Sequence, residues 1–166
     1  MRILIRVSYD GTAYSGWQIQ PNATTVEGTL RQAVCSLFGS DIELIGASRT
    51  DAGVHALGNV AVFDVDTRIP APKISYALNV RLPDDIRVWQ SIQVEDGWHP
   101  RYQNSRKTYE YRILNRTFRM PTRRLDTYFY HHSFIIIRWM WKKCAGRLAF
   151  WSESMILRVF VRSVHR

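Results

Sequence analysis

The segment from Gly46 to Ala56 brings a carboxylate, a guanidinium and an imidazole into one short stretch of chain. Its sequence, Gly-Ala-Ser-Arg-Thr-Asp-Ala-Gly-Val-His-Ala, interrupts the apolar periodicity on either side and contains Arg49, Asp51 and His55. The glycine inside it, Gly53, can adopt backbone angles that other residues avoid, which would let a substrate approach the main chain closely. Catalytic groups are often held on such loops between rigid elements. Asp51 is therefore a candidate catalytic carboxylate.

The same residues also suit a tight loop that carries no chemistry. An Asp side chain in such a loop can accept hydrogen bonds from its own backbone, and Arg49 would then be its solvated partner. Arg and Asp two positions apart are common in loops, so the residue types alone leave both interpretations open. For His55, and for His99 further along the chain, we expect a structural hydrogen-bonding role.

A second group of residues could bind nucleic acid. Basic residues recur between positions 101 and 116, with Tyr102 and Tyr109 among them; they are Arg101, Arg106, Lys107, Arg112 and Arg116. Cations that follow a phosphate backbone, with aromatic rings interleaved, are typical of a single-stranded nucleic-acid groove. Taken singly, each of these side chains would ordinarily be a solvated surface charge.

Composition and charge narrow the choice of partner. The chain has 166 residues, of which 46% are hydrophobic, and a formal charge of +9. This predicts one globular domain and favours an acidic partner, nucleic acid first and a membrane surface second. The charge is uneven, because residues 1–132 hold 16 Lys and Arg against 13 Asp and Glu, whereas residues 133–166 hold 7 against 1. Most of the basic excess therefore lies in the last fifth of the chain.

Several other classes of site are not indicated. Cys35 and Cys144 have no CxxC spacing and no nearby pair of His residues, so we expect neither a metal site nor a disulfide framework. The strand-like pattern begins at the first residues, which leaves no room for a signal peptide. The strongest apolar run, residues 134–141, is broken by Arg138 and is too short for a bilayer span. We expect a cytoplasmic protein with no membrane contact.

Hydrophobic periodicity predicts the elements that hold the candidate residues. Alternation over residues 3–9 is typical of a strand with one buried face. Thr24 and Glu27 have capping-box spacing, so a helix is expected over 25–38 and is ended by Gly39. Further expected elements are strands over 42–47 and 60–65, a helix over 71–82, and strands over 86–94 and 107–114. This mixture, without strict β-α-β alternation, predicts an α+β antiparallel sheet with helices on one face.

The loop and its surroundings resemble a known family. Arg-Thr-Asp-Ala-Gly-Val-His, present here from Arg49 to His55, is the hallmark of TruA-type tRNA pseudouridine synthases. Other segments match blocks of that family in the same order: Tyr9–Tyr14, Gly16–Gln18, Thr25–Gly28, Asn79–Ile86, Trp98–Tyr102 and Arg106–Arg112. The resemblance covers residues 1–132. It implies a ferredoxin-like fold that forms one half of the pseudouridine synthase fold.

The resemblance also implies roles for individual residues. Asp51 would be the catalytic aspartate of the isomerisation of uridine to pseudouridine, acting as nucleophile at the sugar or as base towards a sugar proton. Tyr109 would stack on the target base, although a buried strand aromatic is the alternative for this residue. Arg49 would pair with Asp51 or fill the space left by the flipped base, and Arg101, Arg106 and Lys107 would contact RNA. The reaction only rearranges atoms, so neither a cofactor nor a metal is expected.

The implied partner is the anticodon arm of tRNA, with uridines 38 to 40 in tRNA numbering as the family's substrates. Intact members of the family would be expected to form homodimers. A rival interpretation is a non-catalytic RNA-binding module of ferredoxin-like architecture. Such a module would carry a stacking platform of the Lys/Arg-Gly-Phe/Tyr type, which the sequence lacks, and it would leave the motif from Arg49 to His55 without a role.

Residues 133–166, called the tail below, depart from the family. The family continues there with an amphipathic helix and a Leu-Val-Gly-Glu-His-Asp-Phe-like segment, and then with a second α+β half that completes the active-site cleft. The tail instead holds three of the six Trp and one carboxylate, without a clear helix or strand period. Codons for 151–157 can be chosen so that a shifted frame gives Val-Gly-Glu-His-Asp-Phe. We expect an N-terminal half-domain over 1–132, followed by an aberrant, out-of-frame tail, and a truncated chain that is inactive.

Overall fold

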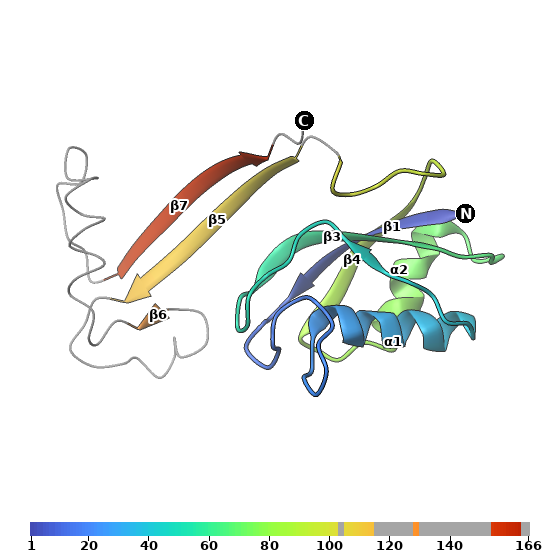
Figure 1. Cartoon of the computed structure of the whole chain (residues 1–166), viewed down its shortest axis with the longest axis horizontal. Coiled ribbons are helices and arrows are strands. Elements are labelled where there is room, and N and C mark those ends of the chain that lie inside the picture. Colours follow the sequence, from blue (N-terminus) through green and yellow to red (C-terminus); the bar gives the residue numbers. More distant parts are fainter. Residues whose placement is uncertain (103–104, 115–127, 130–153, 164–166) are drawn as a thin grey trace. The chain divides into compact units, whose positions relative to one another are not determined.

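The computed structural model describes residues 1–102, 105–114, 128–129 and 154–163, with side chains for 1–102 and 108–110. The chain divides into two compact units, Met1–Gln103 and Asn104–Val164 (Figure 1). Each unit is described by itself.

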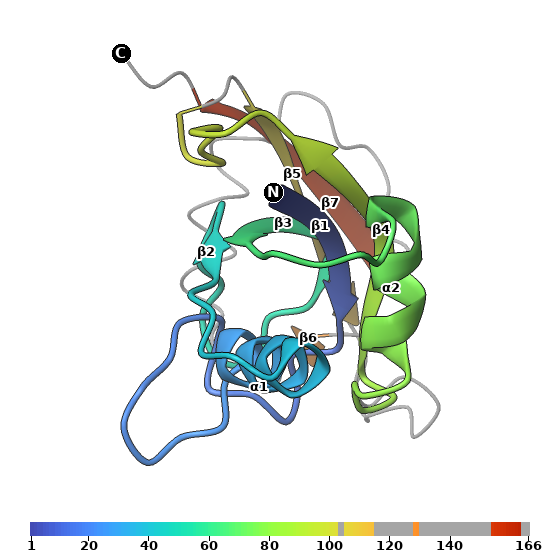
Figure 2. The same cartoon turned by 90° about the vertical axis from the view of Figure 1, so that its right-hand side faces the viewer.

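The first unit is a four-stranded sheet with two helices. Its elements are β1 (Arg2–Tyr9), α1 (Val26–Phe38), β2 (Ile45–Gly46), β3 (Ala56–Asp64), α2 (Ala71–Asn79) and β4 (Ile86–Val94). The strands lie in the order β2-β3-β1-β4, and every neighbouring pair is antiparallel. Both helices pack on one face of the sheet (Figure 2). The predicted α+β, ferredoxin-like class is confirmed.

Strand β1 is central because it pairs with β3 on one side and β4 on the other. Its alternate residues Ile3, Ile5, Val7 and Tyr9 are buried, at 0% to 4% exposure. They join apolar residues of both helices in one core, among them Leu30 of α1 and Leu78 of α2. The period-2 pattern of this strand thus predicted both its existence and its buried face.

The first helix is as expected except at its start. Thr25, and not Thr24, is the N-cap, and its side-chain oxygen accepts from the Gly28 backbone N–H at 3.3 Å. Glu27 does not complete a capping box but accepts from the backbone N–H of Ile19 at 3.2 Å. Gly39 ends the helix in the left-handed conformation, as predicted.

The predicted strand over 42–47 is shorter in the structure. Ile42 and Leu44 are buried, at 7% and 6% exposure, yet only Ile45 and Gly46 pair with β3. An alternating apolar pattern reports burial on one side; it does not require a ladder of backbone hydrogen bonds. The helix predicted over 71–82 likewise ends at Asn79. The strand over 86–94 has the predicted bounds.

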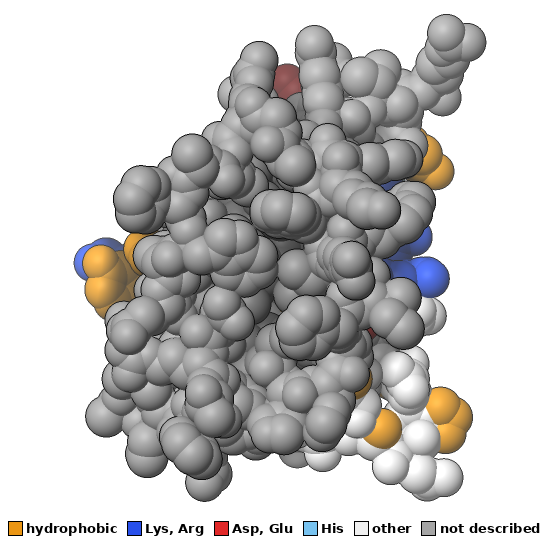
Figure 3. Space-filling model, turned by 90° about the vertical axis from the view of Figure 1, so that its left-hand side faces the viewer, with side chains coloured by type: hydrophobic (Ala, Val, Ile, Leu, Met, Phe, Trp, Pro, Cys, Tyr) orange, Lys and Arg blue, Asp and Glu red, His pale blue; other side chains and the backbone are white. Residues whose placement is uncertain are grey.

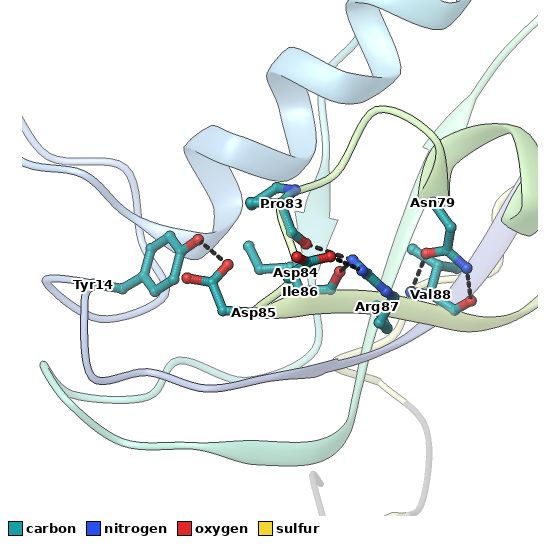
Figure 4. Close-up of polar contacts among 8 residues, drawn as sticks. All are labelled: Tyr14, Asn79, Pro83, Asp84, Asp85, Ile86, Arg87 and Val88. Carbon is teal, nitrogen blue, oxygen red and sulfur yellow. Dashed lines mark hydrogen bonds and ion pairs between the residues drawn. The ribbon is translucent and has the colours of Figure 1, made fainter. Parts of the chain in front are cut away.

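The connection from α2 to β4 is closed by a side-chain amide. Asn79 donates from Nδ2 to the carbonyl of Val88 at 2.9 Å and accepts at Oδ1 from the Val88 N–H at 2.8 Å (Figure 4). The amide thereby satisfies both backbone groups of one strand residue, as a neighbouring strand would. This contact fixes where β4 begins relative to the end of α2.

The second unit contains β5 (Ser105–Leu114), β6 (Tyr128–Phe129) and β7 (Ser154–Ser163). Strands β5 and β7 pair antiparallel along their full length, while β6 pairs parallel with β5. The tail thus contributes one described strand, β7. This strand is a nearly continuous run of apolar and β-branched residues, which favours strands without showing the period of two. The rest of the tail lies outside the described residues.

Candidate functional site

The segment of residues 47–55 (the 47–55 loop) joins β2 to β3 at the end of the sheet where Tyr9 pairs with Ala56. Its first residue still belongs to the hairpin, since the Ala47 N–H donates to the Val60 carbonyl at 2.7 Å. The next four residues alternate. Ser48 and Thr50 are half-buried, whereas Arg49 and Asp51 are exposed.

The buried side-chain amide of Asn59 holds Ser48, the first half-buried residue of the alternating stretch. The hydroxyl of Ser48 donates to Oδ1 of Asn59 at 3.0 Å, and Nδ2 of Asn59 donates to the Ser48 carbonyl at 3.0 Å. Asn59 Oδ1 also accepts from the N–H of Val60 at 3.0 Å. Asn59 is 7% exposed, so these bonds satisfy a polar group that water cannot reach freely.

The buried phenol of Tyr9 holds Thr50, the second half-buried residue of this stretch. The Tyr9 hydroxyl lies 2.8 Å from Thr50 Oγ1, and the Thr50 carbonyl accepts from the N–H of Trp17 at 3.0 Å. The rings of Tyr9 and Trp17 are 5.8 Å apart. Burial raises the pKa of the Tyr9 hydroxyl, which therefore stays protonated at neutral pH.

The loop is also pressed against the segment that follows β1. A Cβ atom added to Gly16 would lie 2.6 Å from the Thr50 carbonyl oxygen, and Gly16 has a φ of +88°. The N–H of Gly53 donates to the Tyr14 carbonyl at 3.2 Å. Gly53 itself has a φ of +77°, which confirms that this position uses a conformation favoured by glycine.

Tyr14 also connects the segment after β1 to Asp85, which lies just before β4. Its hydroxyl donates to Asp85 Oδ1 at 2.7 Å (Figure 4), and the Asp85 carbonyl accepts from the N–H of Asp10 at 2.9 Å. Burial, together with the Asp85 carboxylate, raises the pKa of the Tyr14 hydroxyl well above its ordinary value. Three segments far apart in the sequence are thus joined around the 47–55 loop.

The two histidines have structural hydrogen bonds, as predicted. His55 Nδ1 accepts from the Gly11 N–H at 3.2 Å and lies 3.1 Å from Asp10 Oδ1. The pKa of the Asp10 carboxyl is lowered, mainly by hydrogen bonds with Thr12 and less by His55. His99 Nδ1 accepts from the Arg101 N–H at 3.2 Å.

Asp51 and Arg49 both lie exposed on the loop, and the structure has no ion pair between them. Tyr109 lies on β5 in the second unit, with 45% of its surface exposed. Its ring is therefore not a fully buried core aromatic. Tyr109 and Asp51 belong to different units.

The predicted RNA-binding residues divide into two groups. Arg101 is exposed as a residue, but its Nε donates to the Gly46 carbonyl at 3.1 Å, so it is attached to the strand that leads into the loop. The side chains of Arg106 and Lys107 lie outside the described residues. Lys and Arg side chains among the described residues are visible in Figure 3.

Residues that sequence reasoning missed are those that hold the loop: Tyr9, Tyr14, Asn59 and Asp85. Two of them, Tyr9 and Tyr14, stand in the first block that resembles the family, which is the signal that could have identified them. Their partners lie 41 and 71 positions away along the chain. Periodicity within one element carries no information about such contacts.

Other kinds of site are not seen in the described part of the chain. A cavity of about 150 Å³ lies at the opposite end of β1, and its lining, which includes Arg2 and Asp64, takes in no residue of the 47–55 loop. Among the described residues, no three His, Cys, Asp or Glu side chains gather as metal ligands would. No described helix is long and apolar enough to cross a bilayer.

Comparison with known proteins identifies the family. The family model described as tRNA pseudouridine synthase matches residues 5–103, the whole of the first unit except its first strand residues. The chain is 52% identical over 146 residues to tRNA pseudouridine synthase A of Thermoanaerobacter sp. (strain X514), covering 88% of this chain and 59% of that protein. This chain belongs to the tRNA pseudouridine synthase family.

Other relatives give the same result. The tRNA pseudouridine synthase A of Acetivibrio thermocellus is 48% identical over 126 residues, which cover 76% of this chain and 52% of the relative. That of Caldicellulosiruptor saccharolyticus is 44% identical over 129 residues, which cover 78% and 52%. The chain thus spans between half and three fifths of the length of these relatives. The match of 146 residues with the Thermoanaerobacter protein is long enough to include part of the tail.

The close approach of Gly16 to the loop gives a testable consequence. Gly16→Ala should lower the free energy of unfolding by about 1–3 kcal/mol more than Gly97→Ala, because its Cβ would overlap the Thr50 carbonyl. Gly97 is a matched control: its φ is +86°, and a Cβ there would meet nothing within 4 Å. Urea unfolding of both variants measures the difference. Equal losses would show that backbone strain alone, and not contact with the loop, determines the effect.

Proposed function

We propose that this chain is the part of a tRNA pseudouridine synthase that carries the catalytic aspartate, and that Asp51 is that residue. The observation that carries the proposal is the 47–55 loop. It has the family's hallmark sequence, its inward side chains are fixed by hydrogen bonds, and its carboxylate is exposed to solvent. An exposed carboxylate on an immobilised loop can meet a substrate without first breaking a contact of its own.

The reaction needs one group that helps to break a bond and is then restored. The N1–C1′ bond of uridine breaks, the uracil rotates, and C5 bonds to C1′, while C5 gives up its hydrogen and N1 gains one. A carboxylate can act as a nucleophile at the sugar or as a base towards a sugar proton. Atoms are only rearranged, so no cofactor has to supply electrons or a transferred group.

The proposal also gives roles to Arg49 and Tyr109. Arg49 is exposed on the same loop as Asp51 and is not bound to it, which favours a role in filling the space of the flipped base over a fixed ion pair. Tyr109 has 45% of its surface exposed, so part of its ring is available to stack on a base. Stacking offsets the interactions that a uridine loses when it leaves an RNA helix.

The proposed substrate is the anticodon arm of tRNA, at uridines 38 to 40, in a cytoplasmic enzyme that is a homodimer when complete. Arg101, Arg106 and Lys107 would bind its phosphates. Arg101 supports this because it is already attached to the strand leading into the loop, through the Gly46 carbonyl. The RNA-binding module without catalysis, our alternative, predicts the same binding but no dependence of any reaction on Asp51.

We further propose that residues 1–132 are the half-domain that carries the loop, that the tail is out of frame, and that the printed chain is inactive without a second half. The charge shift after residue 132 supports the boundary. Two observations support a boundary of the half-domain further along the chain than residue 132. Strand β7 pairs with β5, and the match to the Thermoanaerobacter protein includes part of the tail.

The role of Asp51 is tested by substitution in a chain extended through the second half. Asp51→Asn should leave tRNA binding within a few-fold and abolish isomerisation, because the amide is neither nucleophile nor base. Release of tritium from 5-tritiated uridine in tRNA measures the reaction, since C5 loses its hydrogen. Asp66→Asn, an exposed carboxylate outside the loop, should keep full activity. Turnover above about one percent in the Asp51 variant would exclude Asp51 from the chemistry.

The role of Tyr109 is tested in the same extended chain. Tyr109→Ala should weaken binding of tRNA by about 1–3 kcal/mol, the cost of one lost base stack, while Tyr109→Phe keeps the ring and should bind well. Filter binding at fixed salt measures both. If Tyr109→Ala is unfolded by circular dichroism while Tyr109→Phe is native, the residue is a structural aromatic and the stacking role is wrong.

The origin of the tail is tested at the level of DNA. Sequencing through and beyond the codons for 133–166 should reveal a second reading frame that continues the family sequence. Joining the two frames should give a protein of the length of the relatives, and this protein should isomerise uridine when the printed chain does not. An uninterrupted single frame with no alternative coding would show that the tail is a native part of this protein.

A further inference from the structure

The 47–55 loop exposes Asp51 and Arg49 because of what its other residues do. Between Ser48 and Asp51 the side chains alternate, with Ser48 and Thr50 bonded inwards and the other two exposed. Side chains that alternate in this way point to opposite sides of the chain. A slip of one residue would bring Asp51 inwards and Thr50 outwards. Whatever holds Thr50 therefore decides the direction of Asp51.

Thr50 is held at both its side chain and its carbonyl. Oγ1 lies 2.8 Å from the hydroxyl of Tyr9, and the carbonyl accepts from Trp17 N–H at 3.0 Å. Tyr9 is 4% exposed and ends the central strand, where its neighbours on the same face are core residues. Its hydroxyl is consequently fixed in space by packing, and it presents a polar atom at the end of an otherwise apolar face.

We propose that Tyr9 is a positioning residue for Asp51: its buried hydroxyl fixes Thr50 inwards and so sets the outward direction of Asp51 and Arg49. This inference rests on the proposed function for its catalytic consequence. The hydrogen bond between Tyr9 and Thr50, called the tether below, does not depend on that function. Tyr9 does not touch substrate in this scheme. Its hydroxyl links the sheet to the loop through Thr50, 41 positions away along the chain. The same hydroxyl also bonds the side chain of Asn59, which holds Ser48.

If Tyr9 holds Thr50, its substitution should have a different effect from that of a residue that only packs in the core. Tyr9→Phe keeps the ring, its packing and its contact with Trp17, and removes only the oxygen. Hydrogen exchange of the amides that fasten the loop should accelerate by about five- to tenfold, the effect of one net hydrogen bond. These amides are Trp17, Gly53 and Val54. In the active, extended chain kcat should fall about tenfold with KM within twofold, because binding surfaces are unchanged.

Matched variants separate the tether from general stability. Tyr76→Phe makes the same change at an exposed position of α2 and should alter nothing. Thr50→Val removes the oxygen that bonds the Tyr9 hydroxyl and should repeat the effect of Tyr9→Phe. Thr50→Ser keeps a hydroxyl and should leave hydrogen exchange and kcat at their wild-type values. The double variant Tyr9→Phe with Thr50→Val should be no worse than the more severe single variant, because both changes remove the same hydrogen bond.

The experiment measures exchange on the 166-residue chain and turnover on the extended chain. Uniform acceleration that includes the amides of α1, or a lower Tm with unchanged kcat, would show that Tyr9 only supports the fold and would overturn the proposal. Additive effects in the double variant would also overturn it. If the extended wild type fails to isomerise uridine, the proposed function is wrong, whereas the exchange data still confirm or refute the tether.

Discussion

Burial of one face of β1 is the constraint from which the rest of the first unit follows. Because the strand pairs on both sides, its inward residues have helices above them and no freedom to turn away. Tyr9 is the last of these residues, and it is also the one that carries a polar atom. The apolar core therefore ends at a fixed hydroxyl, and the loop is fastened to that point.

Main-chain contacts fasten the loop in addition to the side-chain hydrogen bonds. The segment from Asp10 to Trp17 meets the loop through backbone hydrogen bonds and through glycine positions without space for a Cβ. Contacts made by backbone atoms do not require an additional side-chain rotamer to be fixed. Asp85 extends the same arrangement to the start of β4 by bonding the Tyr14 hydroxyl. The loop is thus supported by the distant segment that ends β1 and follows it, and this segment is in turn bonded to Asp85.

The sequence predicted those features that depend on neighbouring residues. Alternation defined β1, helical spacing with Gly39 defined α1, and the break in periodicity placed Asp51 on a loop between two strands. The sequence did not predict features that depend on distant residues. Thr25 replaces Thr24 as the N-cap of α1, and Ile42 is buried without pairing in a strand. Strand β7 was not predicted because its apolar residues, interrupted by Arg158, do not alternate with polar ones. The tether from Tyr9 to Thr50 joins two segments that only the folded sheet brings together.

The contact between Arg101 and β2 has a consequence for recognition. Nε of Arg101 is committed to the Gly46 carbonyl, which fixes the plane of the guanidinium before any ligand arrives. A free arginine on a surface samples many rotamers and must give them up when it binds a phosphate. An arginine anchored in this way has lost part of that freedom during folding, so its remaining N–H donors meet an anion with a smaller entropic penalty. The short strand β2 thereby anchors Arg101 at the start of the 47–55 loop.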